Sequence, residues 1–119
     1  MLLLTPHMKI LIAIEACDFR NGIDGLAAIC RKRLNQNPFD GGVFIFRNRR
    51  GTAIKILAFD GLGYYLVLRR FSKGRLKWWP DKGSEPITQL AARELQVLIN
   101  KGIPQSAQFE EDWRPLPIH

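Results

Sequence analysis

Arginine and lysine gather in one segment of the chain, where they alternate with short runs of aromatic and β-branched residues. The first group, Arg47, Arg49 and Arg50, lies at the end of one predicted strand and in the turn that follows it. The second group surrounds a later turn and consists of Arg69, Arg70, Lys73, Arg75 and Lys77. Long cationic side chains at turns can reach a phosphate backbone without being buried. If the strands form one meander, both groups can meet, and the pattern then predicts a surface that binds a polyanion.

The distribution of charge supports this interpretation. Residues 1–40 carry five Lys or Arg against four Asp or Glu, residues 41–82 carry ten against two, and residues 83–119 carry three against five. The net charge is +7, so the excess belongs to residues 41–82. A patch of this density can neutralise several phosphates. The alternative is a sheet whose charged edges stay solvated and prevent aggregation.

Two adjacent tryptophans, Trp78 and Trp79, follow the second basic group. Neighbouring side chains of a strand point to opposite faces, so one of the two is expected in the core. The other, for which we take Trp78, can stack on an unpaired base or cover the edge of the core. The sequence favours packing over stacking.

Acid–base or metal-dependent catalysis has little support. The only histidines are His7 and His119, each near a terminus of the sequence. The carboxylates that could converge on metal ions, as in two-metal phosphoryl transfer, are Glu15, Asp18, Asp24 and Asp60. Asp24 suits a helix start, Asp60 suits a turn, and Asp18 can pair with Arg20. We therefore predict a protein that is not an enzyme and needs no metal or other cofactor.

Length and composition suit one domain, because 119 residues with 46% hydrophobic content can build one ordinary core. Cys17 and Cys30 have no CxxC motif and no histidine nearby, so we expect buried thiols in a reducing cytoplasm. The apolar start lacks the features of a secretory signal, and no run approaches the roughly 18 apolar residues of a membrane helix. These features predict a cytoplasmic protein.

The first elements are a strand and a helix. Residues 9–14 are short, apolar and β-branched, which predicts a buried strand. Apolar residues at spacings of three and four then predict a helix whose buried face is Ile23, Leu26, Ala27, Cys30 and Leu34. Asn21 is the expected N-cap, and Asp24 lies in the first turn. Gly22 and Gly25 weaken that turn, which implies close backbone packing or a ligand.

A β-meander is predicted next. Pro38 and two glycines at residues 37–42 predict a turn, and strands are predicted at 43–47, 53–59, 64–71 and 75–79. Asp60 and Gly61 indicate a hairpin, and Pro80 ends the last strand. These elements predict an α+β fold in which a short antiparallel meander of about four to five strands packs with one helix before it and one after.

Thr88 is expected to cap the second helix, which continues to Asn100 with Gly102 just past its end. The tail from Ile103 combines prolines with an acidic run, and we expect it to be extended and partly mobile. The sequence thus divides into an extension at 1–8, one α+β domain at 9–102 and a Pro-rich acidic tail at 103–119.

Four linked stretches of the sequence resemble a known family. They are DFRNGIDGLA at 18–27, VFIFRNRR at 43–50, IKILAFDG at 54–61 and RRFSKGRLKWWP at 69–80. In this order and spacing they are similar to the TnpB, or second open reading frame, accessory proteins of the IS66 class of bacterial insertion sequences. Those proteins are unrelated to the RNA-guided nucleases that share the name TnpB. The family pattern falls on Asp18, Arg20, Gly22, Asp24, Gly25, Leu26, Phe46, Arg47, Arg50, Lys55, Asp60, Gly61, Gly63, Arg70, Gly74 and Pro80.

The resemblance implies a small non-catalytic protein that is encoded beside a separate transposase and assists transposition. It also adds Lys55 to the candidate nucleic-acid-binding residues. The chain departs from the pattern in three places. Asn21 stands where a basic residue is common, Leu62 replaces a frequent aspartate, and the tail from Pro104 is not the usual short basic ending.

We therefore expect an accessory factor of DNA transposition that binds DNA through the basic meander and contacts the transposase or another protein of the element. One alternative is an adaptor whose positive field recruits an acidic partner without touching DNA. The other is a small metal-dependent nuclease that uses Asp18, Asp24 and Asp60.

The motif at residues 18–25 has its own pair of hypotheses. In the first, its role is structural: Asp24 caps the helix and pairs with Arg20, which fastens the helix start to the first strand. In the second, the helix start and its glycines bind an anion or a partner. The sequence favours the structural role.

Overall fold

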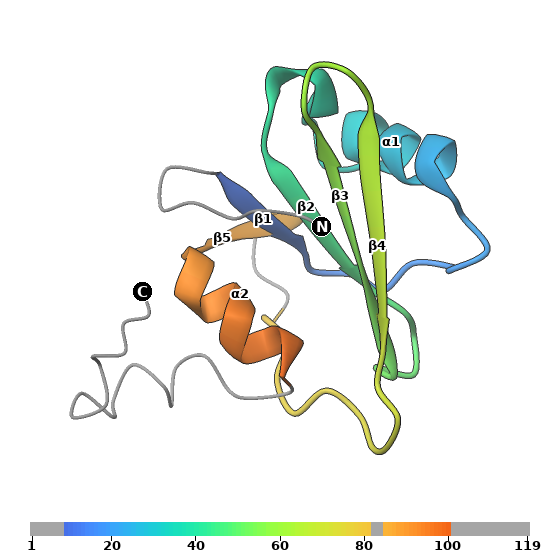
Figure 1. The fold of residues 1–119 in the computed structure, drawn as a ribbon, viewed down its shortest axis with the longest axis vertical. Helices are drawn as coiled ribbons and strands as arrows, with labels where there is room; N and C mark the ends of the chain where they lie inside the picture. The colour runs from blue at the N-terminus through green and yellow to red at the C-terminus, as the bar shows by residue number, and fades with distance from the viewer. Residues whose placement is uncertain (1–8, 82–84, 101–119) are drawn as a thin grey trace.

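The computed structural model describes residues 9–81 and 85–100. Its elements are β1 (Ile10–Ala13), α1 (Ile23–Lys32), a short 3-10 helix η1 (Pro38–Asp40), β2 (Val43–Arg47), β3 (Ala53–Phe59), β4 (Tyr64–Arg70), β5 (Ile87–Leu90) and α2 (Ala92–Ile99). Figure 1 shows one sheet with α1 and α2 on opposite sides of it, and the predicted α+β class is confirmed. Neither described helix is long and apolar enough to span a bilayer. The expectations for residues 1–8, Gly102 and the tail at 103–119 lie outside the described residues.

The five strands form one sheet in the order β4-β3-β2-β1-β5. β2, β3 and β4 are antiparallel neighbours and form the predicted meander, with bounds that agree with the predictions to within one residue. β1 runs parallel to β2, because α1 carries the chain back between these two strands. β5 pairs antiparallel with the other edge of β1. The complete sheet is therefore mixed.

Each face of the sheet has its own core, because successive side chains of a strand point to opposite faces. In β3, Ile54 and Ile56 belong to the core on the α2 side, where Leu95 of α2 packs. Leu57 belongs to the core on the α1 side, where Leu26 of α1 packs. The helices thus cover opposite faces of the same strands.

The two cysteines are buried free thiols on the α1 side, as predicted. Burial raises the pKa of the Cys30 thiol to about 12, and it also raises the pKa of Cys17. A thiol that stays protonated is a weak nucleophile, so both cysteines contribute packing rather than chemistry.

Residues 75–79 do not form the predicted fourth strand of the meander. Gly74, with φ of +72°, turns the chain away from β4. Leu76, Trp78 and Trp79 then pack against the core on the α2 side. The alternation that resembled a strand therefore belongs to a loop with one apolar side, which covers the sheet instead of extending it.

The last strand, β5, comes from residues that were predicted to begin a helix. Thr88 lies in β5 opposite Ile12, so it is not a helix cap. β1 is buried on both faces, and its second edge needs a hydrogen-bonding partner, which β5 supplies. α2 then begins later than predicted, with Ala91 as N-cap, whose backbone N–H donates to the Glu94 carboxylate at 2.8 Å.

Candidate nucleic-acid interface

A basic concavity lies at the end of the sheet where the β2–β3 turn meets the loop that follows β4 (Figure 1). Its volume is about 240 Å³. We use the name basic concavity for this hollow. It is lined by Arg47, Arg49, Arg50, Gly51, Arg75, Leu76, Lys77, Trp78 and Trp79. None of these residues is acidic. Folding thus brings together residues from both of the basic groups that the sequence separates.

Two backbone hydrogen bonds hold the loop against the turn. The N–H of Phe71 donates to the carbonyl of Thr52 at 3.0 Å, and the N–H of Leu76 donates to the carbonyl of Gly51 at 2.7 Å. Gly51 has φ of +70°, a left-handed conformation that glycine adopts without strain. The basic concavity is therefore built on backbone contacts as well as on side chains.

Asn48 fixes the shape of the β2–β3 turn. Its Oδ1 accepts from the backbone N–H of Thr52 at 2.9 Å and of Ala53 at 3.2 Å, and its Nδ2 donates to Thr52 Oγ1 at 2.8 Å. Arg49 and Arg50 project from this locked turn and are exposed. Sequence reasoning missed Asn48, although an asparagine that opens a turn commonly bonds to backbone groups two or more residues ahead.

Arg47 is the most enclosed cation of the basic concavity. It is half-buried at the end of β2, and its guanidinium carbon lies 5.7 Å from the centroid of a Trp79 ring. The Trp79 indole is itself anchored, because Nε1 donates to the carbonyls of Ala13 at 2.9 Å and Ile14 at 3.2 Å. The buried Nε of Arg47 has no acceptor among the described residues. This donor is therefore unsatisfied within the described part of the fold.

The two tryptophans do not point to opposite faces of a strand as predicted. Both are half-buried, and both pack against the core on the α2 side while lining the basic concavity. Trp79 is the anchored one, and no hydrogen bond is found for the indole of Trp78 among the described residues. Packing, which the sequence favoured, accounts for both rings, and Trp78 stays a candidate for a stacking contact.

Three residues of the second basic group lie outside the basic concavity. Arg69 and Arg70 end β4 and line a separate hollow beside the end of α2. They pair across the sheet with Ile54 and Ala53, so their side chains point to opposite faces. Lys73 is exposed in the loop but is not a lining residue. The structure therefore divides the second basic group and brings only Arg75 and Lys77 to the first.

Lys55 lies on the other face of the sheet and has a structural contact. Its Nζ donates to the backbone carbonyls of Phe19 at 2.9 Å and Asn21 at 2.8 Å. The same ammonium group lies 5.0 Å from the centroid of the Phe19 ring. Two hydrogen bonds of Lys55 are therefore made to the segment that leads into α1, on the face of the sheet opposite the basic concavity.

The motif at residues 18–25 forms a compact turn above Lys55. Arg20 donates to both oxygens of the Asp18 carboxylate, from Nη2 to Oδ2 at 2.6 Å and from Nε to Oδ1 at 3.2 Å. The side-chain and backbone hydrogen bonds from Arg20 lower the pKa of Asp18 to about 2. The predicted Asp18–Arg20 pair is confirmed. The predicted Asp24–Arg20 pair is wrong, because the guanidinium group is turned to Asp18.

The start of α1 also differs from the prediction. Gly22 is the N-cap, without a side-chain hydrogen bond, so neither Asn21 nor Asp24 caps the helix. Asn21 instead donates from Nδ2 to the carbonyl of Asp18 at 2.9 Å. A Cβ on Gly25 would lie 2.3 Å from Asn21 Oδ1, so this glycine makes room for the asparagine. The predicted close packing at the glycine is found, and the neighbour is a side chain of the same turn.

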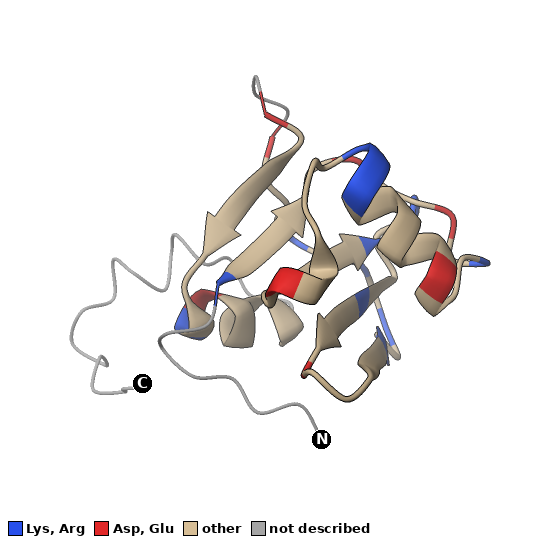
Figure 2. Cartoon of the chain, turned by 90° about the horizontal axis from the view of Figure 1, so that it is seen from above, with Lys and Arg blue, Asp and Glu red and all other residues tan. Residues whose placement is uncertain are grey.

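A further group of basic residues, separate from the two groups of the meander, lies at the end of α1, as Figure 2 shows. Arg31, Lys32 and Arg33 are exposed there and lie in or beside the last turn, where cations stabilise the helix dipole. This group has an ordinary explanation as the solvated end of a helix. It also provides matched residues for control substitutions.

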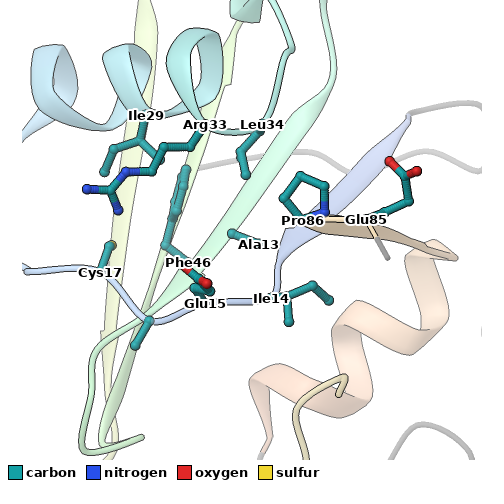
Figure 3. A pocket seen from close by; sticks show the side chains of 11 residues that line it. Ala13, Ile14, Glu15, Cys17, Ile29, Arg33, Leu34, Phe46, Glu85 and Pro86 are labelled. Carbon is teal, nitrogen blue, oxygen red and sulfur yellow. The ribbon is translucent and has the colours of Figure 1, made fainter. Parts of the chain in front are cut away.

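A second cavity, of about 380 Å³, lies between the end of α1 and the start of β5 (Figure 3). Ile29 and Leu34 line it from the side of α1, and Ile14 and Pro86 line it from the opposite side. Its lining also includes the charged residues Glu15, Arg33 and Glu85. The guanidinium group of Arg33 extends toward the side of Cys17 in this view. This cavity could not be predicted from local sequence, because its walls come from four separate segments.

The carboxylates do not assemble a metal site in the part of the chain that the structure describes. No three His, Cys, Asp or Glu residues there are placed to hold a metal ion. Asp60 closes the β3–β4 turn, where its Oδ1 accepts from the N–H groups of Leu62 and Gly63, each at 2.9 Å. These hydrogen bonds lower the pKa of Asp60. Its predicted role in a turn is confirmed.

Comparisons with known proteins agree with the motifs. The family model described as IS66 Orf2 like protein matches residues 8–108. Among curated proteins, the uncharacterized protein y4hO of Sinorhizobium fredii (strain NBRC 101917 / NGR234) is 31% identical over 112 residues, which cover 94% of each chain. The uncharacterized protein y4jC of the same organism is 31% identical over 92 residues, or 77% of each chain. No solved structure matches. This chain belongs to the IS66 Orf2-like family.

Proposed function

We propose that this protein is a non-catalytic accessory factor of transposition that acts in the cytoplasm and binds the phosphate backbone of DNA through the basic concavity. Membership of the IS66 Orf2-like family supports the accessory role. The observation that carries the DNA contact is the convergence of five cationic side chains and two tryptophans in a hollow without an acidic lining residue.

The chemistry of the basic concavity suits phosphate. Guanidinium groups present several N–H donors in a plane and can bind phosphate oxygens in pairs. Arg47 also lines the basic concavity, and its guanidinium group can contribute to phosphate binding through N–H groups other than the buried Nε. Phosphate contacts carry little sequence information, so we expect binding with little sequence preference.

A salt titration tests the proposal. Dissociation constants for duplex and single-stranded DNA are measured at several salt concentrations, and the affinity should fall steeply because each phosphate contact releases counterions. Replacing Arg49 and Arg50 by alanine should reduce the slope of log K against log salt by about 1 to 2. Both side chains are exposed, so their loss should leave the fold intact.

The control removes the same charge elsewhere. Arg31→Ala combined with Lys32→Ala lowers the net charge equally, but at the exposed end of α1. The slope of this control should stay close to that of the parent protein. Equal slopes for the two double variants would show that general positive charge, and not the basic concavity, attracts DNA. A parent slope near zero would instead favour the adaptor without DNA contact.

The second part of the proposal is a contact with the transposase. The cavity beside α1 supports it, since a hollow that combines apolar walls with a few charged groups offers a place for a side chain of a partner protein (Figure 3). Ile29→Lys, which places a charge in the wall of this cavity, should weaken capture of the purified transposase. The same variant should bind DNA with an unchanged salt slope. If the variant loses both transposase capture and DNA binding, the proposal that these two contacts use separate surfaces is contradicted.

A further inference from the structure

β4 forms one edge of the sheet, and its outer side has no strand partner among the described residues (Figure 1). It is seven residues long and regular, whereas β5 at the opposite edge has four. A long edge strand presents a row of unpaired N–H and C=O groups, which can pair with another strand.

Exposed hydrophobic side chains gather at this same edge. The large hydrophobic residues that are exposed in the described part of the chain are Leu62 at 96%, Phe39 at 56%, Leu68 at 54% and Tyr65 at 40%. Tyr65 and Leu68 belong to β4 and form the patch at its edge, whereas Leu62 lies beyond the strand in the β3–β4 hairpin and is not part of this patch. Phe39 packs beside Tyr64 of β4, with ring centroids 5.8 Å apart. An apolar patch that follows an open strand edge indicates a protein contact.

The hydrogen bonds of β4 to β3 show which backbone groups point outward. Phe71 donates to Thr52, and Gly63 accepts from Asp60, so odd-numbered residues of this strand bond to β3. Because the pattern alternates, Tyr64, Leu66, Leu68 and Arg70 direct their N–H and C=O groups to the open edge.

We propose that β4 pairs antiparallel with β4 of a second copy of this chain, with Val67 on the twofold axis. This register uses all seven residues and sets outward-directed residues opposite each other, Leu66 with Leu68 and Tyr64 with Arg70 of the partner. An antiparallel ladder requires this match of outward-directed groups. The dimer joins two five-stranded sheets into one.

The charges of β4 favour this self-pairing. When Val67 lies on the twofold axis, Arg69 faces Tyr65 of the other copy and Arg70 faces Tyr64 of the other copy. Each cation therefore lies opposite an aromatic residue. Registers centred on Arg69 or Arg70 would instead set two arginines opposite each other, which is destabilising. The register centred on Val67 pairs both arginines of β4 with tyrosines and includes the whole strand, so the strand is complementary to itself there, as a twofold interface requires.

Sedimentation of the full chain tests the proposal with a matched pair of variants. The parent should form a dimer at about 100 µM and dissociate on dilution. Leu68→Lys should raise the dissociation constant by about tenfold or more, because one substitution changes two symmetric contacts in each dimer. Leu62→Lys makes the same chemical change at an exposed leucine outside the strand, and it should leave the dimer unaltered.

Cross-linking tests the register and does not depend on Leu68→Lys being well folded. Two cysteines at position 67 would face each other across the axis at about 4.5 Å between Cα atoms, within the range of a disulfide. Val67→Cys should therefore form a covalent dimer in oxidised glutathione. Leu68→Cys, although more exposed, places its two thiols on a diagonal at about 8 Å and should not. The native cysteines are buried.

Three results would overturn the proposal. A parent chain that stays monomeric at about 100 µM would exclude this dimer as a stable assembly. Equal weakening by Leu62→Lys and Leu68→Lys would place the contact outside the strand. Cross-linking of Leu68→Cys that equals that of Val67→Cys would reflect random collision or another register.

Discussion

Two charged regions of this protein use cations in opposite ways. At the turn of residues 18–25, two cations have defined protein partners. Arg20 binds the Asp18 carboxylate, and Lys55 of β3 donates to the carbonyls of Phe19 and Asn21. In the basic concavity, cations from two segments line a hollow without an acidic residue, and a donor of Arg47 lacks an acceptor among the described residues.

The difference separates structural charge from charge that can meet a ligand. A cation whose hydrogen bonds are satisfied inside the fold contributes to stability and gains little from a polyanion. Cations that repel one another in a shared hollow cost stability, and a bound phosphate removes this cost. The contact geometry, and not the number of positive charges, therefore distinguishes the two regions.

The largest expected effect is on Trp79, which supports the basic concavity. Trp79→Ala should lower the free energy of unfolding by about 3 kcal/mol, the lower end of the range for this truncation, because the ring is half-buried. Trp79→Phe keeps a ring but loses the indole donor to Ala13 and Ile14, and it should cost about 1 kcal/mol. Chemical denaturation measures both. Equal losses would mean that the hydrogen bonds, and not the packing, hold the loop.

Lys55 and Arg50 give the sharpest contrast between the regions. Lys55→Met leaves two backbone carbonyls without their donor and should lower stability by about 1 to 3 kcal/mol, with little change in the salt slope of DNA binding. Arg50→Met should change stability by no more than about 0.5 kcal/mol and reduce that slope by about 1. Denaturation and salt titration of both variants decide the matter. A reduced slope for Lys55→Met alone would reverse the assignment of the two cations.

The change in stability caused by Gly25→Ala should have opposite signs with and without the Asn21 side chain. Gly25→Ala places a Cβ against Asn21 Oδ1, which displaces the side chain and its bond to Asp18, and we expect a loss of up to about 1 kcal/mol. An Asn21→Gly background removes the Asn21 side chain and its Cβ, which would lie 3.1 Å from the new Cβ, so Gly25→Ala should stabilise by up to about 1 kcal/mol there through helix propensity. Thermal unfolding of the four proteins measures this coupling. The same effect in both backgrounds would exclude the Asn21 contact as the reason for the glycine.

The smallest effect concerns the acid stability of the exposed Asp18–Arg20 pair. The pKa of Asp18 is lowered to about 2 from 3.8 by the hydrogen bonds from Arg20, so the pair contributes stability above pH 3.8 and loses it as the pH falls toward 2. Asp18→Asn lacks this contribution, and the gap between the parent and the variant should close over that pH range. Asp24→Asn, in the same turn, is the control. A gap that is constant with pH would contradict the role of the pair.

The meander could be predicted from the sequence because its signals are local. β2 and β3 have the predicted bounds, since β-branched and aromatic runs lie between turns whose glycines and Asp60 act on neighbouring residues. The structure of residues 75–79 could not be predicted from local signals. Its alternation was present, but Gly74 and the anchoring of Trp79 on β1 direct it over the core.

Local pattern also failed for β5 and for the start of α1. Residues 87–90 become a strand because β1, far away in the sequence, has an open edge. Tertiary pairing then overrides a modest helical preference. The sequence also predicts capping roles for Asn21 and Asp24. In the structure Asn21 and Arg20 donate hydrogen bonds to Asp18 instead, and neither Asn21 nor Asp24 caps the helix.

The sequence by itself determined that this is an α+β chain of the IS66 Orf2-like family with a basic, aromatic central segment, because composition, periodicity and linked motifs are properties of the chain alone. Only the tertiary structure decided which cations share a surface. Arg47 and Lys55 lie eight residues apart on adjacent antiparallel strands, yet strand alternation places them on opposite faces of the sheet. Arg75 reaches the first basic group because the loop after β4 folds back onto the β2–β3 turn, a contact that no local spacing encodes.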